Sequence, residues 1–182
     1  MSGDVVDLIM QDHREVERLF EQMKQEPDQR PMLVPVVTTL LVAHSRAEEA
    51  EVYPVARDEA DEADEVAHSQ EEHAKAEQLL QRLASTDHHA SDFDTLLDEL
   101  IKDVTHHVEE EESAVLPGMR ERLSDERRTE LGEAFLAARA QHMGDQPGEA
   151  TKDELLRQAR NAGIEGASSM TRDELHKALS QG

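Results

Sequence analysis

The 182-residue sequence contains no cysteine. This absence excludes disulfide bonds, thiolate zinc sites, iron–sulfur clusters and cysteine nucleophiles, and leaves His, Asp and Glu as candidate metal ligands. Basic residues are scarce, with 19 Lys and Arg against 42 Asp and Glu, which gives a formal net charge of −23. Such a charge repels nucleic-acid phosphates and anionic membranes, so general nucleic-acid binding is disfavoured.

Long apolar runs are also missing. No stretch approaches the roughly 18 apolar residues needed to cross a bilayer, and residues 1–7 lack the basic start and continuous apolar run of a signal peptide. We therefore expect no membrane partner and a cytoplasmic location. The acids alternate with aliphatic residues at helical spacing, which predicts a folded, helix-rich protein.

Five segments with a helical apolar stripe precede residue 142. They cover approximately residues 5–23, 33–55, 63–84, 91–117 and 124–138. Pro54 is expected to kink or end the second segment and Pro117-Gly118 to end the fourth, while Asp4 and Ser124 are candidate N-caps. The pattern predicts an all-α fold, an up-down-up-down four-helix bundle with an extra fifth helix packed outside it or across one end.

The sequence changes character after the bundle. Residues 143–150 are rich in Gly, Pro and polar residues and are expected to form a linker between a bundle over 1–142 and a small two-helix module over 151–182. The module contains two Thr-x-x-Glu capping boxes, which begin at Thr151 and Thr171.

Histidines and acids interrupt the apolar stripes of all four bundle helices. They are His13, His44 with Glu48, His73 with Glu77, and His107 with Glu111. Residues four apart on a helix differ by about 40° around its axis, so each pair faces the same interior layer. Several buried carboxylates need compensating positive charge, which metal ions would supply. Mixed imidazole and carboxylate ligands favour iron or manganese, and seven ligands fit two ions.

One histidine on an apolar stripe is usually a hydrogen-bonded core residue, but the convergence of seven such groups favours metal binding. The remaining histidines lie in turns, off the stripes or near the C-terminus, and are expected on the surface without a role. They are His68, His88, His89, His142 and His176.

Three runs resemble hemerythrin HHE cation-binding domains over residues from about 4 to 140. They are Asp12–Phe20, His44–Pro54 and His107–Pro117. The last two share His-x-x-x-Glu-Glu with a Pro ten residues after the histidine. The resemblance implies an oxo- or hydroxo-bridged centre of two iron ions, with Glu48 and Glu111 as bridging carboxylates and the four histidines named above as terminal ligands.

Two positions bear on this comparison. Oxygen-carrying hemerythrins have a histidine where this chain has Glu77, so the resemblance implies a centre that favours the ferric state over simple reversible oxygen carriage. In the fourth helix, His106 and Glu112 are alternatives to His107 and Glu111, although the Leu100-Val104 stripe fits the latter pair best.

The resemblance implies a non-haem di-iron protein that binds or reacts with O2, peroxide or nitric oxide as a sensor, scavenger or stress-response protein. Peroxidase, catalase-like or oxidase activity would need an open coordination position and a proton donor, for which the sole tyrosine, Tyr53, is a candidate. The alternative is an iron-responsive interaction module without redox catalysis, whose tail contacts a protein partner.

The C-terminal module resembles the helix–extended-loop–helix unit at the N-terminus of transcription terminator Rho and in SAP-like domains. Such units often bind nucleic acid, but residues 149–182 contain five Lys and Arg against six Asp and Glu. Nucleic-acid binding, packing on the bundle and a protein contact therefore stay as alternatives for this segment.

Overall fold

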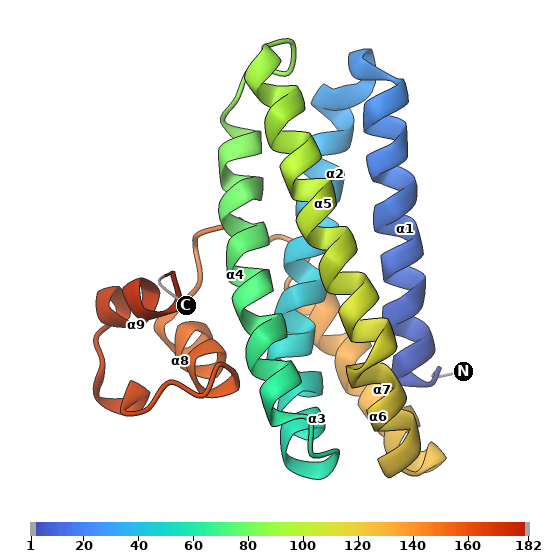
Figure 1. The fold of residues 1–182 in the computed structure, drawn as a ribbon, viewed down its shortest axis with the longest axis vertical. Coiled ribbons are helices and arrows are strands. Elements are labelled where there is room, and N and C mark those ends of the chain that lie inside the picture. Colours follow the sequence, from blue (N-terminus) through green and yellow to red (C-terminus); the bar gives the residue numbers. More distant parts are fainter. Residues whose placement is uncertain (1–2, 181–182) are drawn as a thin grey trace.

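The bundle predicted from the sequence is present in the computed structural model, which describes residues 3–180 (Figure 1). Its four long helices are α1 (Val5–Gln25), α2 (Arg30–Ala47), α4 (Ala63–Ala84) and α5 (Ser91–Ser113). Helix α7 (Asp125–Gln141) packs against α1 and α2 as the expected fifth helix. Short helical segments complete this part of the chain: η1 (Pro27–Gln29), η2 (Glu48–Val52), α3 (Tyr53–Glu59) and α6 (Val115–Arg122).

Helix caps follow the sequence. The Asp4 side chain accepts a hydrogen bond from the backbone N–H of Val6 (2.9 Å), and Ser124 accepts one from the N–H of Arg127 (3.2 Å). These side chains satisfy N–H groups that have no partner within the first turn of a helix. Both N-cap predictions are therefore confirmed.

Two helix ends involve proline: Pro54, expected to kink or end its segment, does not end it, and the fourth segment ends earlier than expected. The chain stays helical through Pro54 because η2 is a π turn in which the N–H of Tyr53 bonds to the carbonyl of Glu48, and α3 then accepts Pro54 in its first turn. Helix α5 ends at Ser113, earlier than expected, and Pro117 lies in the first turn of α6. Proline is tolerated there because the first N–H groups of a helix need no partner within it.

The apolar core of the bundle is divided into two clusters. One contains Phe20, Met23, Leu97 and Leu100 among its buried side chains, and the other contains Ile9, Val52, Leu116 and Phe135. The inward-facing histidines lie between them: along α1, for example, Ile9 belongs to one cluster and Val16 to the other, with His13 in between. The bundle therefore holds a polar layer sandwiched between two apolar regions.

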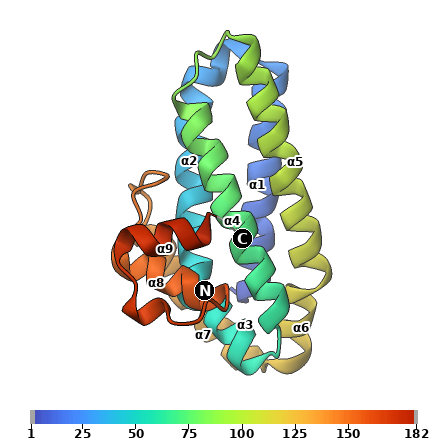
Figure 2. The ribbon, with the colours of Figure 1, turned by 60° about the vertical axis from the view of Figure 1, so that its left-hand side comes forward.

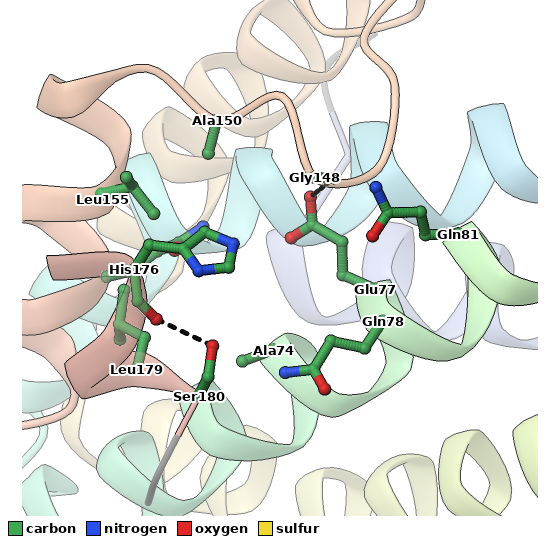
Figure 3. A pocket seen from close by; sticks show the side chains of 11 residues that line it. Ala74, Glu77, Gln78, Gln81, Gly148, Ala150, Leu155, His176, Leu179 and Ser180 are labelled. Atoms are coloured by element: carbon green, nitrogen blue, oxygen red, sulfur yellow. Dashed lines mark hydrogen bonds between the residues drawn. The ribbon is translucent and has the colours of Figure 1, made fainter. Parts of the chain in front are cut away.

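The C-terminal segment forms α8 (Lys152–Asn161), η3 (Ala167–Ser169) and α9 (Arg172–Leu179) around a small apolar core of its own. Both capping boxes form as predicted. Helix α8 lies against α4, η2 and α3, so the module packs on the side of the bundle (Figure 2). A crevice of about 60 Å³ remains between α4 and the module (Figure 3).

Candidate metal centre

The polar layer brings six of the seven predicted site residues together. These six residues form two groups of candidate ligands that share Glu48. Within each group, the ligand atoms all lie within 4.8 Å of one another. The first group consists of His13, His44, Glu48 and Glu111, and the second of Glu48, His73 and His107. All six side chains are buried, with Glu48 and Glu111 fully inaccessible to solvent.

The Nε2 atoms of the four histidines face the two carboxylates. His13 Nε2 lies 3.2 Å from Glu111 Oε2, and His44 Nε2 lies 3.2 Å from Glu48 Oε2. His73 Nε2 is 3.4 Å from the same Glu48 oxygen. The Nε2 atoms of His73 and His107 approach to 3.2 Å. Nitrogen and oxygen lone pairs from all four bundle helices therefore converge on one small volume.

Many of these atoms lack a hydrogen-bond partner. Among the described residues, the buried side-chain atoms without one include the Nε2 atoms of His13 and His44 and both carboxylate oxygens of Glu48 and Glu111. An unpaired buried carboxylate is costly, and these oxygens are close to imidazole nitrogens without being aligned for hydrogen bonding. Cations placed between the atoms would satisfy all of them at once, so the donor set fits a metal centre.

The π turn η2 starts at Glu48. A π turn adds a residue to one helical turn and is frequently found at functional sites. Here it lies directly after His44, at the point where the chain supplies Glu48 to the layer and Tyr53 behind it. The Tyr53 hydroxyl, which is fully buried, lies 3.0 Å from His73 Nε2 and is a further oxygen facing the centre.

Each histidine is held on its outer side by a carboxylate, and of these four the sequence analysis considered only Glu112, as an alternative ligand in place of Glu111. The Nδ1 atoms contact Asp12 (3.1 Å from His44), Glu49 (3.2 Å from His73), Glu72 (2.9 Å from His107) and Glu112 (2.8 Å from His13). A carboxylate at Nδ1 fixes the ring orientation and leaves Nε2 free to bind a metal. All four lie next to a site residue in sequence, so only their direction, set by helix packing, separates them from the inner set.

The surrounding carboxylates raise the pKa values of His44 and His73 in the metal-free protein. Burial alone lowers the pKa of His44, but Glu48 and Asp12 outweigh it and raise the pKa to about 10. The pKa of His73 is likewise raised to about 9 by Glu48 and Glu49 against the effect of burial. Protons on these two imidazoles supply positive charge to the layer when it holds no cation.

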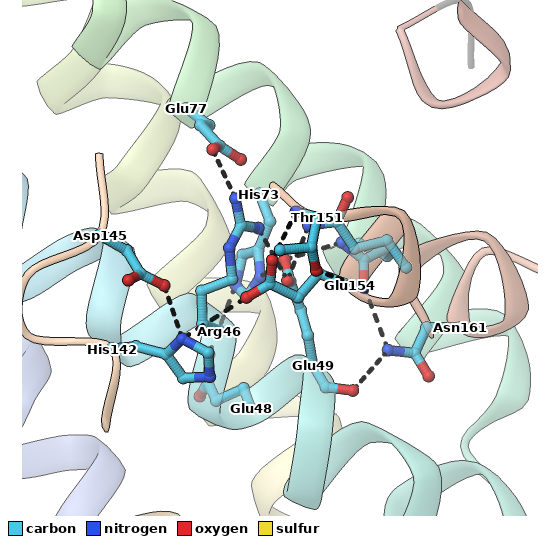
Figure 4. Close-up of polar contacts among 12 residues, drawn as sticks. Arg46, Glu48, Glu49, His73, Glu77, His142, Asp145, Thr151, Glu154 and Asn161 are labelled. Carbon is cyan, nitrogen blue, oxygen red and sulfur yellow. Dashed lines mark hydrogen bonds and ion pairs between the residues drawn. The ribbon is translucent and has the colours of Figure 1, made fainter. Parts of the chain in front are cut away.

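Glu77 is the predicted site residue that the structure places elsewhere. Its Oε1 lies 2.6 Å from a guanidinium nitrogen of Arg46 (Figure 4). The same oxygen accepts a hydrogen bond of 2.8 Å from the N–H of Gly148 (Figure 3). This carboxylate therefore points toward the linker and belongs to neither ligand group. His73 and Glu77 have the spacing of one helix face, but Arg46 on α2 pairs with the Glu77 carboxylate, which lies outside the layer.

The fourth helix presents His107 and Glu111 to the layer. His106 is exposed, with 59% of its side chain accessible, and Glu112 lies outside the inner set, against His13 and Arg14. The structure therefore places His107 and Glu111 in the layer, as the apolar stripe of this helix predicted, and leaves His106 and Glu112 outside it. Of the histidines expected on the surface, His68, His89 and His176 are exposed, while His88 and His142 are half-buried.

The C-terminal module reaches the outer carboxylate of His73. Gln158 donates a hydrogen bond of 2.9 Å to Glu49 Oε2, and the Asn161 amide donates to the backbone carbonyl of Glu49 (3.0 Å; Figure 4). Arg46 lies 3.1 Å from the same carboxylate. Against burial, Arg46, His73 and Gln158 together lower the pKa of Glu49 to about 2. The module thus completes the surroundings of the centre although it contributes no inner residue.

Fold and site together define a helical-bundle protein with a buried imidazole–carboxylate cation site. The family model of the hemerythrin HHE cation binding domain matches residues 4–118. The chain therefore belongs to this cation-binding family. The match ends before the C-terminal module, so it does not extend to the resemblance of that module to Rho and SAP-like units.

A DNA nickase from Nostoc sp. (strain PCC 7120 / SAG 25.82 / UTEX 2576) is 28% identical to the chain over 150 residues. The aligned part covers 81% of this chain and 42% of the relative, so the chain spans less than half the relative's length. No solved structure matches the chain. In residues 3–180, no helix is both long enough and apolar enough to cross a membrane.

Loading the centre is expected to release protons. At about pH 8 the imidazoles of His44 and His73, with pKa values of about 10 and 9, are protonated in the metal-free protein and must lose those protons to bind a cation. Below these pKa values, the affinity of the centre for metal should therefore rise with pH. The release of two protons predicts an increase of about a hundredfold per pH unit. A metal titration in weak buffer with a pH indicator measures the release. Affinity independent of pH would contradict the prediction.

Gln158→Leu is expected to weaken the centre from outside. It leaves one oxygen of the buried Glu49 carboxylate without its amide partner, which should lower the free energy of unfolding by about 1–3 kcal/mol. Metal affinity should fall by about 10- to 100-fold because Glu49 orients His73. Urea unfolding and metal titration measure the two effects. Arg157→Gln, at an exposed neighbour on the same helix, is the control and should change neither.

Proposed function

We propose that the buried centre binds two iron ions and that the protein reacts with O2, peroxide or nitric oxide as a sensor, scavenger or stress-response protein. The observation that carries the proposal is the pair of overlapping ligand groups that share Glu48. Four imidazoles and two carboxylates in two groups suit two adjacent ions, and nitrogen–oxygen donor sets of this kind suit iron. Membership of a cation-binding family supports the same reading.

The residues divide into those that would hold the ions and those that would prepare their environment. Glu48, Glu111 and the Nε2 atoms of the four histidines would hold the ions, with Glu48 common to both ligand groups. When bound, the iron ions supply redox chemistry and coordination positions for a small ligand. The chain itself orients the imidazoles through the outer carboxylates and keeps bulk water out by burying the layer.

A small cavity favours a ligand of few atoms. A space of about 30 Å³ adjoins the four histidines and is otherwise lined largely by apolar side chains such as Val16, Leu41, Val104 and Val108. One water molecule needs about 10–15 Å³ on the same measure. The cavity therefore suits a diatomic or similarly small molecule, whereas an organic substrate would not fit without rearrangement.

Tyr53 is placed to hold a proton at the centre. Its hydroxyl is fully buried 3.0 Å from His73 Nε2. Burial, reinforced by Glu111 and Glu48, raises the pKa of this phenol well above its usual range, so the oxygen keeps its proton in the metal-free protein. We propose that Tyr53 can supply this proton to a small molecule that reacts at the centre, as an enzymatic role would require.

The Nostoc relative is described as a DNA nickase. The net charge of −23 in the present chain opposes the approach of a polyanion. The relative also contains a larger part that this chain does not match. We therefore propose no action on DNA.

Anaerobic titration with ferrous iron, followed by separate exposure to O2, peroxide and nitric oxide, tests the proposal. We expect two irons per chain and a change of visible absorption with at least one of the three molecules. His44→Ala and His107→Ala should abolish this absorption because their Nε2 atoms face Glu48 and Glu111, respectively. His89→Ala, at an exposed position, is the matched control. Saturation by a single zinc ion would refute the proposed di-iron centre. Iron loading without a reaction with any of the three molecules would refute the proposed reactivity and favour the iron-responsive interaction module.

Tyr53→Phe separates binding from proton transfer. Phenylalanine preserves the packing of the ring, so the variant should still bind two irons, while its reaction with peroxide should slow by about 10²–10⁴-fold if the hydroxyl supplies the proton. Stopped-flow absorption measures the rate in parent and variant. Equal rates would show that Tyr53 has only a packing role.

A further inference from the structure

A second group of histidines and glutamates lies on the surface of the same two helices. It consists of His68 and Glu72 on α4 and His106 and Glu110 on α5. Each pair is four residues apart, so both side chains of a pair face the same way from their helix. The helices α4 and α5 pack side by side and place the two pairs opposite each other.

From this arrangement we propose that the four side chains form a separate, solvent-facing site for a divalent first-row transition metal ion such as Zn²⁺. The site is distinct from the buried centre and does not depend on which metal the buried centre holds.

The spacing of the donor atoms fits a single ion. His68 Nε2 lies 3.0 Å from Glu110 Oε2 and 3.7 Å from Glu72 Oε1. His106 Nε2 lies 3.3 Å from Glu110 Oε1 and 3.8 Å from Glu72 Oε1. Ligand atoms around a tetrahedral ion with bonds of about 2.0–2.1 Å are about 3.3 Å apart. The observed separations lie on both sides of this value, so small side-chain movements suffice.

The charge of the group also calls for a cation. Within residues 3–180, neither Glu72 nor Glu110 forms an ion pair with a lysine or arginine, and their charged partners are histidines. The nearby Lys75 is paired with Asp103 at 2.7 Å. Two surface hollows adjoin the group, one lined by His68 and Glu110 and the other by His68, Glu72 and His106. An ion from solvent can therefore reach the four ligands directly.

Glu72 joins the surface group to the buried centre. Its Oε1 faces His68 and His106, while its Oε2 lies 2.9 Å from Nδ1 of the buried His107. A cation bound by Glu72 at the surface would reduce the negative charge of the carboxylate that orients His107. Glu72 thus contacts both sites, so we expect a cation at the surface site to change the surroundings of His107 in the buried centre.

The experiment uses the metal-loaded full chain, freed of loosely held ions on a chelating resin and titrated with Zn²⁺ in a calorimeter at physiological salt. We expect one additional Zn²⁺ per chain. His68→Ala and His106→Ala should each weaken this binding by more than about tenfold, since loss of even an outer partner costs 10- to 100-fold. His89→Ala is the matched exposed control and should bind as the parent does.

Two further measurements complete the test. Glu110→Gln should weaken Zn²⁺ binding but leave the visible absorption of the buried centre unchanged, because Glu110 contacts only the two surface histidines in the site. In the parent, added Zn²⁺ should shift that absorption through Glu72. If the parent bound no additional Zn²⁺, the proposed site would be overturned. It would also be overturned if the His68→Ala and His106→Ala variants bound Zn²⁺ as tightly as the parent, since the ion would then be held only by the general acidity of the surface. Zn²⁺ binding without a spectral shift would overturn the link through Glu72.

Discussion

The burial of two carboxylates at the middle of the bundle is the constraint on which the rest of the structure depends. Glu48 and Glu111 are fully buried and their oxygens have no hydrogen-bond partner among the described residues. Negative charge in such a place must be compensated, because the penalty for removing it from water is several kcal/mol per ion. The four histidines surround these carboxylates and can compensate that charge: the pKa values of His13, His44 and His73 are raised in the metal-free protein, and all four imidazoles are candidate metal ligands.

The requirement extends outward in shells. Once each Nε2 faces inward, each Nδ1 needs an acceptor, and Asp12, Glu49, Glu72 and Glu112 supply one each. These carboxylates need partners in turn: Arg139 pairs with Asp12 and Arg14 with Glu112. The abundance of acid in this chain is thus partly organised, since some of its carboxylates orient the centre and are not only solvated surface charge.

The C-terminal module belongs to the same hierarchy. It has its own capping boxes and a small apolar core, as an independent unit would. Yet Gln158 and Asn161 are buried against Glu49, and Gly148 at the end of the linker bonds to Glu77. The module therefore contacts Glu49, the carboxylate that lies against His73, without contributing a residue to the inner set.

The sequence by itself determined the all-α bundle, the helix caps at Asp4 and Ser124, and six of the inward-facing residues. Each of these follows from local periodicity, because spacing along one helix decides which side chains share a face. Only the tertiary structure decided the rest. Whether Glu77 turns inward depended on Arg46 from another helix, and whether Pro54 ended a helix depended on a π turn stabilised within the bundle. The outer carboxylates and the surface group of His68 and His106 arise from pairs on different helices, and a single helix pattern contains no information about the neighbour that completes them.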